Sequence, residues 1–384
     1  MLLPKVASNI VTIAIILLTA LDSCVIISMK QHNIKSRFLL EPVRNDQPVV
    51  RNVVSFAFWY EEDEKKLGDK GDKELSATMN FNLWCQCDWG AEYPYLDIGF
   101  EVANLSLAQT LFFYLPLSIP EPHNKYIADL GEKFTKTELI DAVFNENYSA
   151  ELAASSKTIM VKPIDPSRDL KPFQIYEIDT AHDIELEPFV SSGGYQGTVM
   201  KIPVARIVAK DTTEETEDRC DTYYFRFRIK NLLLDFLIHD YTPRHAALQS
   251  IFNTTQMIDF RYNNVRSLDK SLVERFYAPG HHIVNVKHTH FLLITKAYVD
   301  VFGEQFKSTR KIEQKVWEEY VDNHDTKDLV AYHHVDEGNS SEMFVRLRLE
   351  KSVIGIYIFT VVVMGIISSL LASGILLRIF PSGP

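Results

Sequence analysis

The stretch Leu75–Asp88, LSATMNFNLWCQCD, decides the fold class because its apolar and polar residues alternate along almost its whole length. The apolar set begins at Leu75 and ends at Cys87, while the alternating set begins at Ser76 and ends at Asp88. A period of two places each set on its own face of a β-strand. This stretch therefore predicts a strand with one buried face and one face in water, and it places Cys85 on the buried face as a small apolar residue.

The same period recurs in nine further stretches of the chain. They are Val50–Tyr60, Leu96–Ala103, Lys157–Lys162, Phe173–Ile178, Thr198–Ala209, Tyr223–Lys230, Met257–Tyr262, Ile283–Thr295 and Met343–Leu349. Few helical patterns lie between them, which argues against a parallel sheet with helical crossovers. Together with 44 aromatic residues, the pattern predicts a mainly β body with a sandwich or barrel-like core.

A few helices are expected beside the strands. Thr135 and Glu138 have the spacing of a capping box ahead of an apolar run that starts at Leu139. Apolar residues also recur at helical spacing between Ile312 and Val321 within a charged stretch. One face of this second helix should therefore pack on the sheet.

Both ends of the chain are apolar, and this sets the expected topology. Residues 352–384 contain 26 consecutive uncharged residues, Ser352–Leu377, which is long enough for a helix to cross the roughly 30 Å hydrocarbon core. Residues 1–29 form a second apolar segment that is broken by Asp22. The sequence predicts a transmembrane helix at each end, with a cleaved signal peptide as the alternative for the first segment.

Charge predicts which side of the membrane the body occupies. The chain has a net charge of −11, but the ends hold only Lys5, Asp22 and Arg378, so residues 30–351 carry a net charge of −12. Seven basic residues lie on the body's side of the spans: Lys30, Lys35, Arg37, Arg44, Arg346, Arg348 and Lys351. The positive-inside rule therefore predicts an inner-membrane protein with two spans and a β-rich cytoplasmic domain at 30–351. The sparse cysteines agree with this compartment.

Several residues of the two ends are candidates for a membrane module. Asp22 lies inside its apolar segment, where a carboxylate is costly, although a place near the interface would also explain it. Gly365, Ser369 and Ser373 follow one another at intervals of four and would let helices approach closely. They predict either that the two spans of one chain pair or that copies of the chain oligomerise, with a weakly polar contact between their helices.

A local basic face is the candidate ligand site of the body. Arg226, Arg228 and Lys230 alternate with apolar residues, and Arg261 and Arg266 flank another strand end. If the two strands pair, they form a basic, aromatic-bordered face that could hold a nucleotide or a phosphate. Ion pairing with neighbouring carboxylates is the alternative, and we favour it.

Metal, cofactor and enzyme signatures are weak or missing. His288 and His290 share a strand face, but neither cysteines nor a carboxylate pair stand at a fixed spacing from them. The glycine-rich Gly193–Gly197 follows no strand-to-helix turn. No phosphate-binding loop, nucleophile elbow, zinc-protease or dinucleotide motif is present. We expect no enzyme activity, no cofactor and no metal, and the acidic body disfavours direct binding to polyanions.

In layout, the chain resembles the two-helix membrane effectors of bacterial anti-phage systems, of the retron or cyclic-nucleotide-signalled type. The resemblance is one of layout, with an apolar helix at each end of the body, and it covers the chain only as a whole. It implies a sensor whose body binds a partner or ligand and whose helices then perturb the inner membrane, which arrests growth in antiviral defence. The implied partners are the lipid bilayer, a protein or a second copy, and a small nucleotide or nucleic-acid complex.

Two other functions fit the same topology. A passive membrane-anchored adaptor or assembly factor would recruit a partner through the β-rich body and use the spans as a tether. A two-span ion channel would place the body outside the cell, against which the basic residues beside the spans and the few cysteines both argue.

Overall fold

The structure is a computed structural model of the 384-residue chain. It describes residues 55–65, 73–89, 94–144, 146–152, 158–165, 167, 170–208, 220–241, 253–303, 306–350 and 361–371. All of them belong to the second of the two units into which the chain divides, Asn52–Pro384.

The described strands form three sheets. The five-stranded sheet contains, in spatial order, β14 (His281–Ile283), β1 (Ala57–Glu62), β4 (Ala108–Leu115), β10 (Gln196–Pro203) and β9 (Glu185–Val190). The ten-stranded sheet contains β17 (Ser308–Lys311), β18 (Leu329–Glu337), β15 (Asn285–Lys296), β2 (Ser76–Trp84), β3 (Tyr95–Ala103), β11 (Thr222–Ile229), β8 (Phe173–Tyr176), β7 (Thr158–Pro163) and β6 (Tyr148–Leu152), and β5 (Ile127–Asp129) also pairs with β11. The four-stranded sheet contains β12 (Ile238–Tyr241), β13 (Asn253–Tyr262), β19 (Ser341–Glu350) and β16 (Asp300–Gly303).

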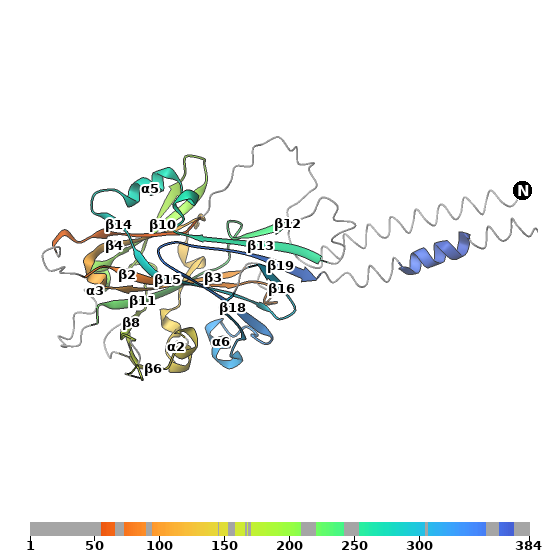
Figure 1. Cartoon of the computed structure of the whole chain (residues 1–384), viewed down its shortest axis with the longest axis horizontal. Coiled ribbons are helices and arrows are strands. Elements are labelled where there is room, and N and C mark those ends of the chain that lie inside the picture. Colours follow the sequence, from red (N-terminus) through yellow and green to blue (C-terminus); the bar gives the residue numbers. More distant parts are fainter. Residues whose placement is uncertain are drawn as a thin grey trace, which may run out of the picture. The chain divides into compact units, whose positions relative to one another are not determined.

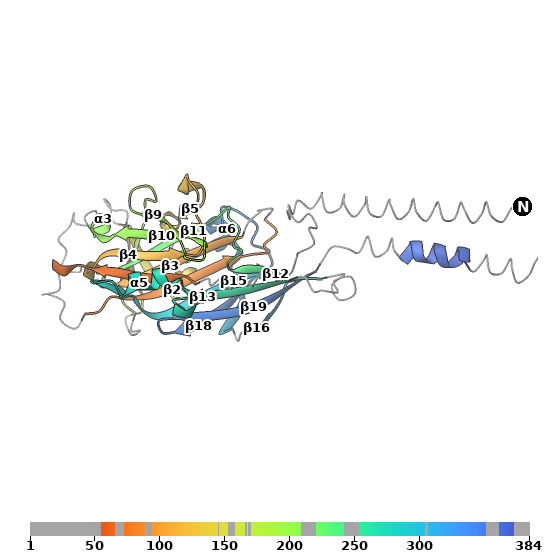
Figure 2. The same ribbon diagram turned by 90° about the horizontal axis from the view of Figure 1, so that it is seen from above.

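Short helices complete the described body. The α-helices are α2 (Thr137–Phe144), α3 (Val204–Val208), α5 (Lys270–Phe276) and α6 (Gln314–Tyr320). The 3-10 turns are η2 (Leu105–Leu107), η3 (His123–Lys125), η4 (Gly131–Lys133) and η5 (Val265–Ser267). Figure 1 shows α5 on one side of the stacked sheets and α2 and α6 on the other, and Figure 2 shows the strands from above.

The main core lies between the ten-stranded sheet and the two smaller sheets. Phe81 of β2 and Phe100 of β3 point into it from one side, and Phe113 of β4 and Phe260 of β13 point into it from the other. Phe81 packs edge to face on Phe260, with ring centroids 4.8 Å apart. The architecture is therefore a sandwich whose aromatic side chains interdigitate between sheets.

Two smaller cores cover the outer faces of the sandwich. Trp59 of β1 packs against Phe276 of α5 on the outside of the five-stranded sheet. Trp84 of β2 packs against Trp317 and Tyr320 of α6 on the outside of the ten-stranded sheet. The helical spacing between Ile312 and Val321 thus correctly predicted a helix that docks on the sheet.

Each of the ten alternating stretches contains residues of a strand, and the strand of Leu75–Asp88 is β2. The sequence pattern missed other strands, of which β4, AQTLFFYL, matters most. This strand is buried on both faces, since Phe113 lies in the main core and Tyr114 in the core beneath α5. A strand buried on both sides reads as a continuous apolar run, so alternation cannot reveal it.

One expected strand has to be shortened. The stretch Thr198–Ala209 was predicted to be a strand throughout, but β10 ends at Pro203 and the helix α3 follows directly. Val204 and Ile207 are the buried residues of α3. Their separation of three residues matches one turn of helix, so their burial favours helix over strand there.

The expected two-span topology needs correction. The first segment, residues 1–29, lies outside the described residues, and within 352–384 only the helix at 361–371 is described. Across the described part of the chain, no helix is both long and apolar enough to cross a membrane. The fold class is therefore corrected to a mainly β sandwich, and the two-span inner-membrane assignment is not supported.

The close packing over β3 generates a first prediction. A Cβ atom added at Gly99 would lie 2.3 Å from the hydroxyl oxygen of Tyr224, which is fully buried. We expect Gly99→Ala to lower the free energy of unfolding by about 1–3 kcal/mol, because the tyrosine has to move in a packed core. Urea denaturation measures this loss as a lower unfolding midpoint at an unchanged m-value.

Gly193→Ala is the matched control. The nearest atom to an added Cβ there is Ser191 Oγ at 3.8 Å, an ordinary contact. The control should shift the unfolding midpoint little. Equal losses at the two glycines would contradict the packing argument.

Candidate functional site

Two of the predicted ligand-binding arginines lie inside the protein. Arg226 and Arg228 of β11 are each 1% exposed. Arg226 donates to the hydroxyl groups of Tyr224 and Tyr320, with both donor–acceptor distances 2.6 Å. Its remaining terminal nitrogen is placed to donate to the side-chain oxygen of Asn82 in the orientation that satisfies both groups. Its donors are therefore taken up by internal partners.

Asp97 of β3 is the carboxylate of this cluster. It accepts from Nε and Nη2 of Arg228 at 2.6 and 3.0 Å, and from the hydroxyl of Tyr320 at 2.8 Å. The indole nitrogen of Trp84 donates to it as well, at 2.8 Å. Burial by itself lowers the pKa of Arg228, but Asp97 and its neighbours outweigh burial and raise it. We call Asp97, Tyr224, Arg226, Arg228 and Tyr320 the arginine network.

The remaining basic candidates do not join this network into one face. Lys230 lies just past the end of β11, whereas Arg261 belongs to β13 in the four-stranded sheet, and β11 and β13 do not pair. Arg261 donates to Asp259 through Nε and Nη2, at 2.9 and 2.8 Å, and its Nη1 donates to Ser267. Arg266 is exposed in η5. The predicted basic face fails because its two strands belong to different sheets, while the ion-pair alternative fits Arg228 and Arg261.

The strand registers show where an open site lies on the outer face of the ten-stranded sheet. Residues directly opposite one another on neighbouring strands share a face. Four such rows cross β15, β2, β3 and β11, and each is given in that strand order. The first row contains Asn285, Ser76, Ala103 and Thr222, and the second row contains His288, Thr78, Glu101 and Tyr224. The third row contains His290, Asn80, Gly99 and Arg226, and the fourth row contains Leu292, Asn82, Asp97 and Arg228. The third and fourth rows hold the guanidinium groups of the arginine network. The first row forms the floor of a pocket.

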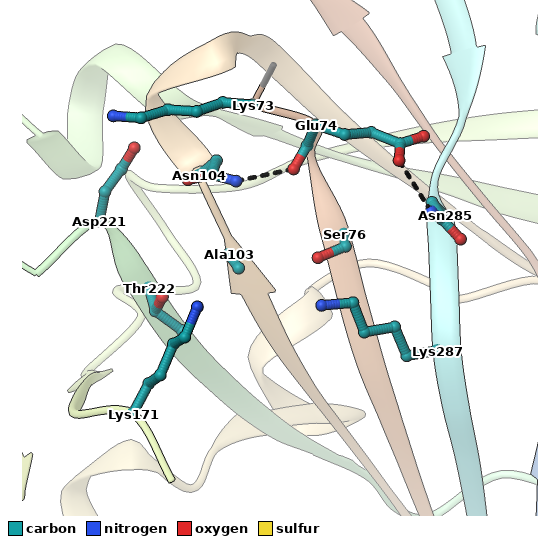
Figure 3. A pocket seen from close by; sticks show the side chains of 10 residues that line it. All are labelled: Lys73, Glu74, Ser76, Ala103, Asn104, Lys171, Asp221, Thr222, Asn285 and Lys287. Carbon is teal, nitrogen blue, oxygen red and sulfur yellow. Dashed lines mark hydrogen bonds between the residues drawn. The ribbon is translucent and has the colours of Figure 1, made fainter. Parts of the chain in front are cut away.

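This pocket, the lysine pocket, has a volume of about 380 Å³. Its lining residues are Lys73, Glu74, Ser76, Ala103, Asn104, Lys171, Asp221, Thr222, Asn285 and Lys287. Figure 3 shows the side chains of Lys171 and Lys287 reaching toward each other from opposite sides of it. The pocket therefore brings together cations that are far apart in the sequence, Lys73 and Lys171 from loops and Lys287 from β15.

A β-bulge places Lys287. The pairing of β15 with β2 shifts between Val286 and His288, which leaves Lys287 as the extra residue. The turn after β18 bonds to the backbone at this bulge. Asn339 Oδ1 accepts a hydrogen bond from the backbone amide of Val286 at 2.8 Å, and the backbone amide of Gly338 donates to the carbonyl of Lys287 at 3.1 Å. A bulge changes the direction of a side chain, and here the ammonium group points into the pocket (Figure 3).

Both carboxylates that line the pocket are already bonded to neutral donors. Asp221 accepts from the amide and the hydroxyl of Ser106, at 3.0 and 2.5 Å. Glu74 accepts from the side-chain amide of Asn285 at 3.0 Å. Within the described residues, no carboxylate oxygen lies within 4 Å of the ammonium groups of Lys171 and Lys287. The pocket therefore exposes positive charge that the protein does not neutralise by a direct ion pair.

Sequence reasoning missed these lysines because they share no local pattern. Lys73 falls in a charged stretch, and Lys171 precedes a short strand. Lys287 belongs to the predicted strand Ile283–Thr295, but strict alternation does not anticipate a bulge. The alternation of Ser76 and Thr78 predicted that this face of β2 lies in water, but only part of it does: Thr78 and Asn80 are partly exposed, whereas Ser76, Asn82 and Trp84 are buried.

The histidines on this face form a pair between β15 and β18. Nδ1 of His290 lies 3.0 Å from Nε2 of His333, and the two rings stack. His288 shares the face of His290, as the alternation predicted, with ring centroids 6.2 Å apart. Among the residues that the structure describes, no group of three or more histidine, cysteine, aspartate or glutamate side chains is placed to hold a metal ion.

Cys85 and Cys87 lie in apolar surroundings. Both are buried, as the apolar face of β2 predicted. Burial raises the pKa of Cys85 to about 12, and the pKa of Cys87 is also raised, first by burial and then by Cys85. Both groups are therefore thiols at neutral pH, the less reactive form of cysteine.

The membrane-module candidates are only partly covered by the structure. Gly365 and Ser369 lie on the helix at 361–371. Asp22 and Ser373 lie outside the described residues. The pairing or oligomerisation predicted for these positions stays a prediction.

The arginine network predicts a large stability effect at Asp97. We expect Asp97→Asn to lower the free energy of unfolding by about 3–5 kcal/mol or to prevent folding, because it leaves buried guanidinium charge without its carboxylate. Asp322→Asn is the control, since Asp322 is 49% exposed at 3.7 Å from Arg228 and should contribute below about 1 kcal/mol. Urea denaturation compares them. Similar losses for the two variants would contradict the role of Asp97.

The histidine pair predicts unusual titration. Burial and the nearby positive charge lower the pKa of His290 and of His333 to about 4 in each case. Both rings should therefore remain neutral down to about pH 5, although an ordinary histidine is protonated there. NMR of the ring carbons across pH 4 to 8 measures this. Titration of either ring near pH 6.5 would contradict the buried, cation-bordered arrangement.

Comparison with known proteins leaves the function to be argued from this geometry. No protein-family model matches the chain, and no curated protein matches it. The resemblance in layout to anti-phage effectors, the adaptor alternative and the expected lack of enzyme activity therefore stay predictions.

Proposed function

We propose that the β-rich body is a receptor for a small oxyanion, such as inorganic phosphate or the phosphate group of a small metabolite, which binds in the lysine pocket. The observation that carries this proposal is the pair Lys171 and Lys287. Their ammonium groups reach into one pocket from opposite sides, and neither has an ion-pair partner among the described residues. The parts of the expected effector function that require two membrane spans are not carried forward, because no described helix supports them.

The chemistry of the lining favours an anion over a neutral ligand. Ammonium groups form short, charge-assisted hydrogen bonds with phosphate oxygens. Thr222 and Ser76 add hydroxyl groups that can donate to the same oxygens. Glu74 and Asp221 keep their negative charge, but they bond to Asn285 and Ser106 and form no ion pair with Lys171 or Lys287, so these two ammonium groups can donate to a ligand.

Size and net charge favour a small ligand over a polymer. A volume of about 380 Å³ lies at the lower end of the range for small-molecule sites. The chain carries a net charge of −11, which repels a nucleic acid at long range. A small anion experiences this repulsion less because three lysines, Lys73, Lys171 and Lys287, line the pocket against two carboxylates, Glu74 and Asp221.

Binding of inorganic phosphate to the full chain tests the proposal. Lys171→Ala and Lys287→Ala should each weaken phosphate binding about tenfold or more, because each removes a charge-assisted bond. Isothermal titration calorimetry at constant ionic strength measures the dissociation constants.

Lys270→Ala is the matched control. It removes the same charge from α5, where Lys270 is fully solvated beside Glu274 and does not line the pocket. The control should bind phosphate like the unmodified chain. Absence of phosphate binding, or an equal loss in the control, would overturn the proposal.

A further inference from the structure

Glu101 lies one row behind the floor of the lysine pocket. It is two residues from Ala103 on the same face of β3, about 7 Å along the strand. Its register neighbours are Thr78 of β2 and Tyr224 of β11. A carboxyl group therefore stands between the pocket and the arginine network, although the pocket receives oxyanions in the proposed function.

Lys287 links Glu101 to the pocket. Burial raises the pKa of Glu101 above its ordinary value, and the positive charge of Lys287 partly offsets this rise. The same ammonium group lines the pocket. An oxyanion that binds Lys287 therefore offsets the positive charge that helps to keep the Glu101 carboxylate ionised.

The other charged and titratable groups around Glu101 come from three segments. The exposed His288 shares its row on β15, while Tyr224 and Arg226 lie on β11. Cys220 lies just before β11, and burial, followed by smaller effects that include Glu101, raises the pKa of both Cys220 and Tyr224. The facing residue of β2 is the uncharged Thr78. Lys287 is the cation that carries the coupling to the pocket.

We infer that Glu101 takes up one proton when an oxyanion enters the lysine pocket. The pocket therefore binds a dianion more tightly when Glu101 is protonated. This inference rests on the proposed function. In the empty pocket, the positive charge of Lys287 favours the ionised form of Glu101 without a direct ion pair between the two groups. When an oxyanion occupies the pocket, a proton from solvent binds a carboxylate oxygen of Glu101, and no covalent bond to carbon forms or breaks.

The direction of the pH dependence follows from this linkage. An anion beside Glu101 raises its pKa further, so the protonated form binds the ligand more tightly. Affinity is then highest below the pKa of Glu101 in the empty pocket. The affinity falls by up to tenfold per pH unit until the pH exceeds the pKa that Glu101 has in the occupied pocket. Above that pH the affinity is low and constant.

Sulfate is the suitable probe because it remains a dianion across the range, whereas phosphate changes its own charge near neutral pH. Calorimetric titration of the full chain with sulfate from pH 4.5 to 8 should show affinity falling as the pH rises. Glu101→Gln should flatten this dependence and bind sulfate at least tenfold more tightly than the unmodified chain at pH 8. His288→Gln, the control for titration on β15, should keep the original dependence.

Proton uptake is measured on the unmodified chain as well, by repeating the titration in buffers of different ionisation enthalpy. Uptake of up to one proton per sulfate supports the inference even if Glu101→Gln does not fold. Binding without proton uptake, an unchanged pH dependence in Glu101→Gln, or its loss in His288→Gln would overturn the inference and leave the proposed function standing. If neither phosphate nor sulfate binds at any pH, the proposed function fails and this inference fails with it.

Discussion

The bonds that Asp97 accepts inside the ten-stranded sheet organise the described structure. One carboxylate accepts from Trp84 of β2, from Arg228 of β11 and from Tyr320 of α6, and Asp97 itself belongs to β3. Three neighbouring strands and the helix above them therefore share one buried charge. Two guanidinium groups and one carboxylate can remain inside a protein only when their hydrogen bonds are satisfied, so this arrangement requires α6 to stay on the sheet.

This constraint divides the outer face of the sheet into a covered end and an open end. Aromatic rings seal the covered end, where Trp84 packs against Trp317 and Tyr320. At the other end of the same strands, Ser76, Ala103 and Thr222 form the floor of the lysine pocket. The same alternation of side chains thus produces a sealed polar network at one end and a solvated polar surface at the other.

Arginine and lysine are distributed between these ends as their chemistry suggests. The planar guanidinium of Arg228 binds both oxygens of a carboxylate and tolerates burial. The ammonium groups of Lys171 and Lys287 are strongly hydrated point charges on exposed, flexible side chains. Arg226 and Arg228 of β11 therefore bond to internal partners, whereas Lys171 and Lys287 reach into the lysine pocket. Glu101 lies between the two groups and connects them electrostatically.

Helical spacing was sufficient to predict the docking face of α6. Alternation along single strands was sufficient to predict the mainly β body and the buried apolar face of β2, because each depends on a local period and on the transfer of apolar side chains from water. It could not reveal β4, which is buried on both faces, or the bulge at Lys287. Nor could it tell that Arg226 and Arg228 lie beneath a helix whose sequence begins more than eighty residues later. The sequence by itself thus determined which faces of the strands and helices are apolar and become buried. Only the tertiary structure decided which charges meet inside the sheet and which lysines share a pocket, because strand order and register bring together segments that no local pattern relates.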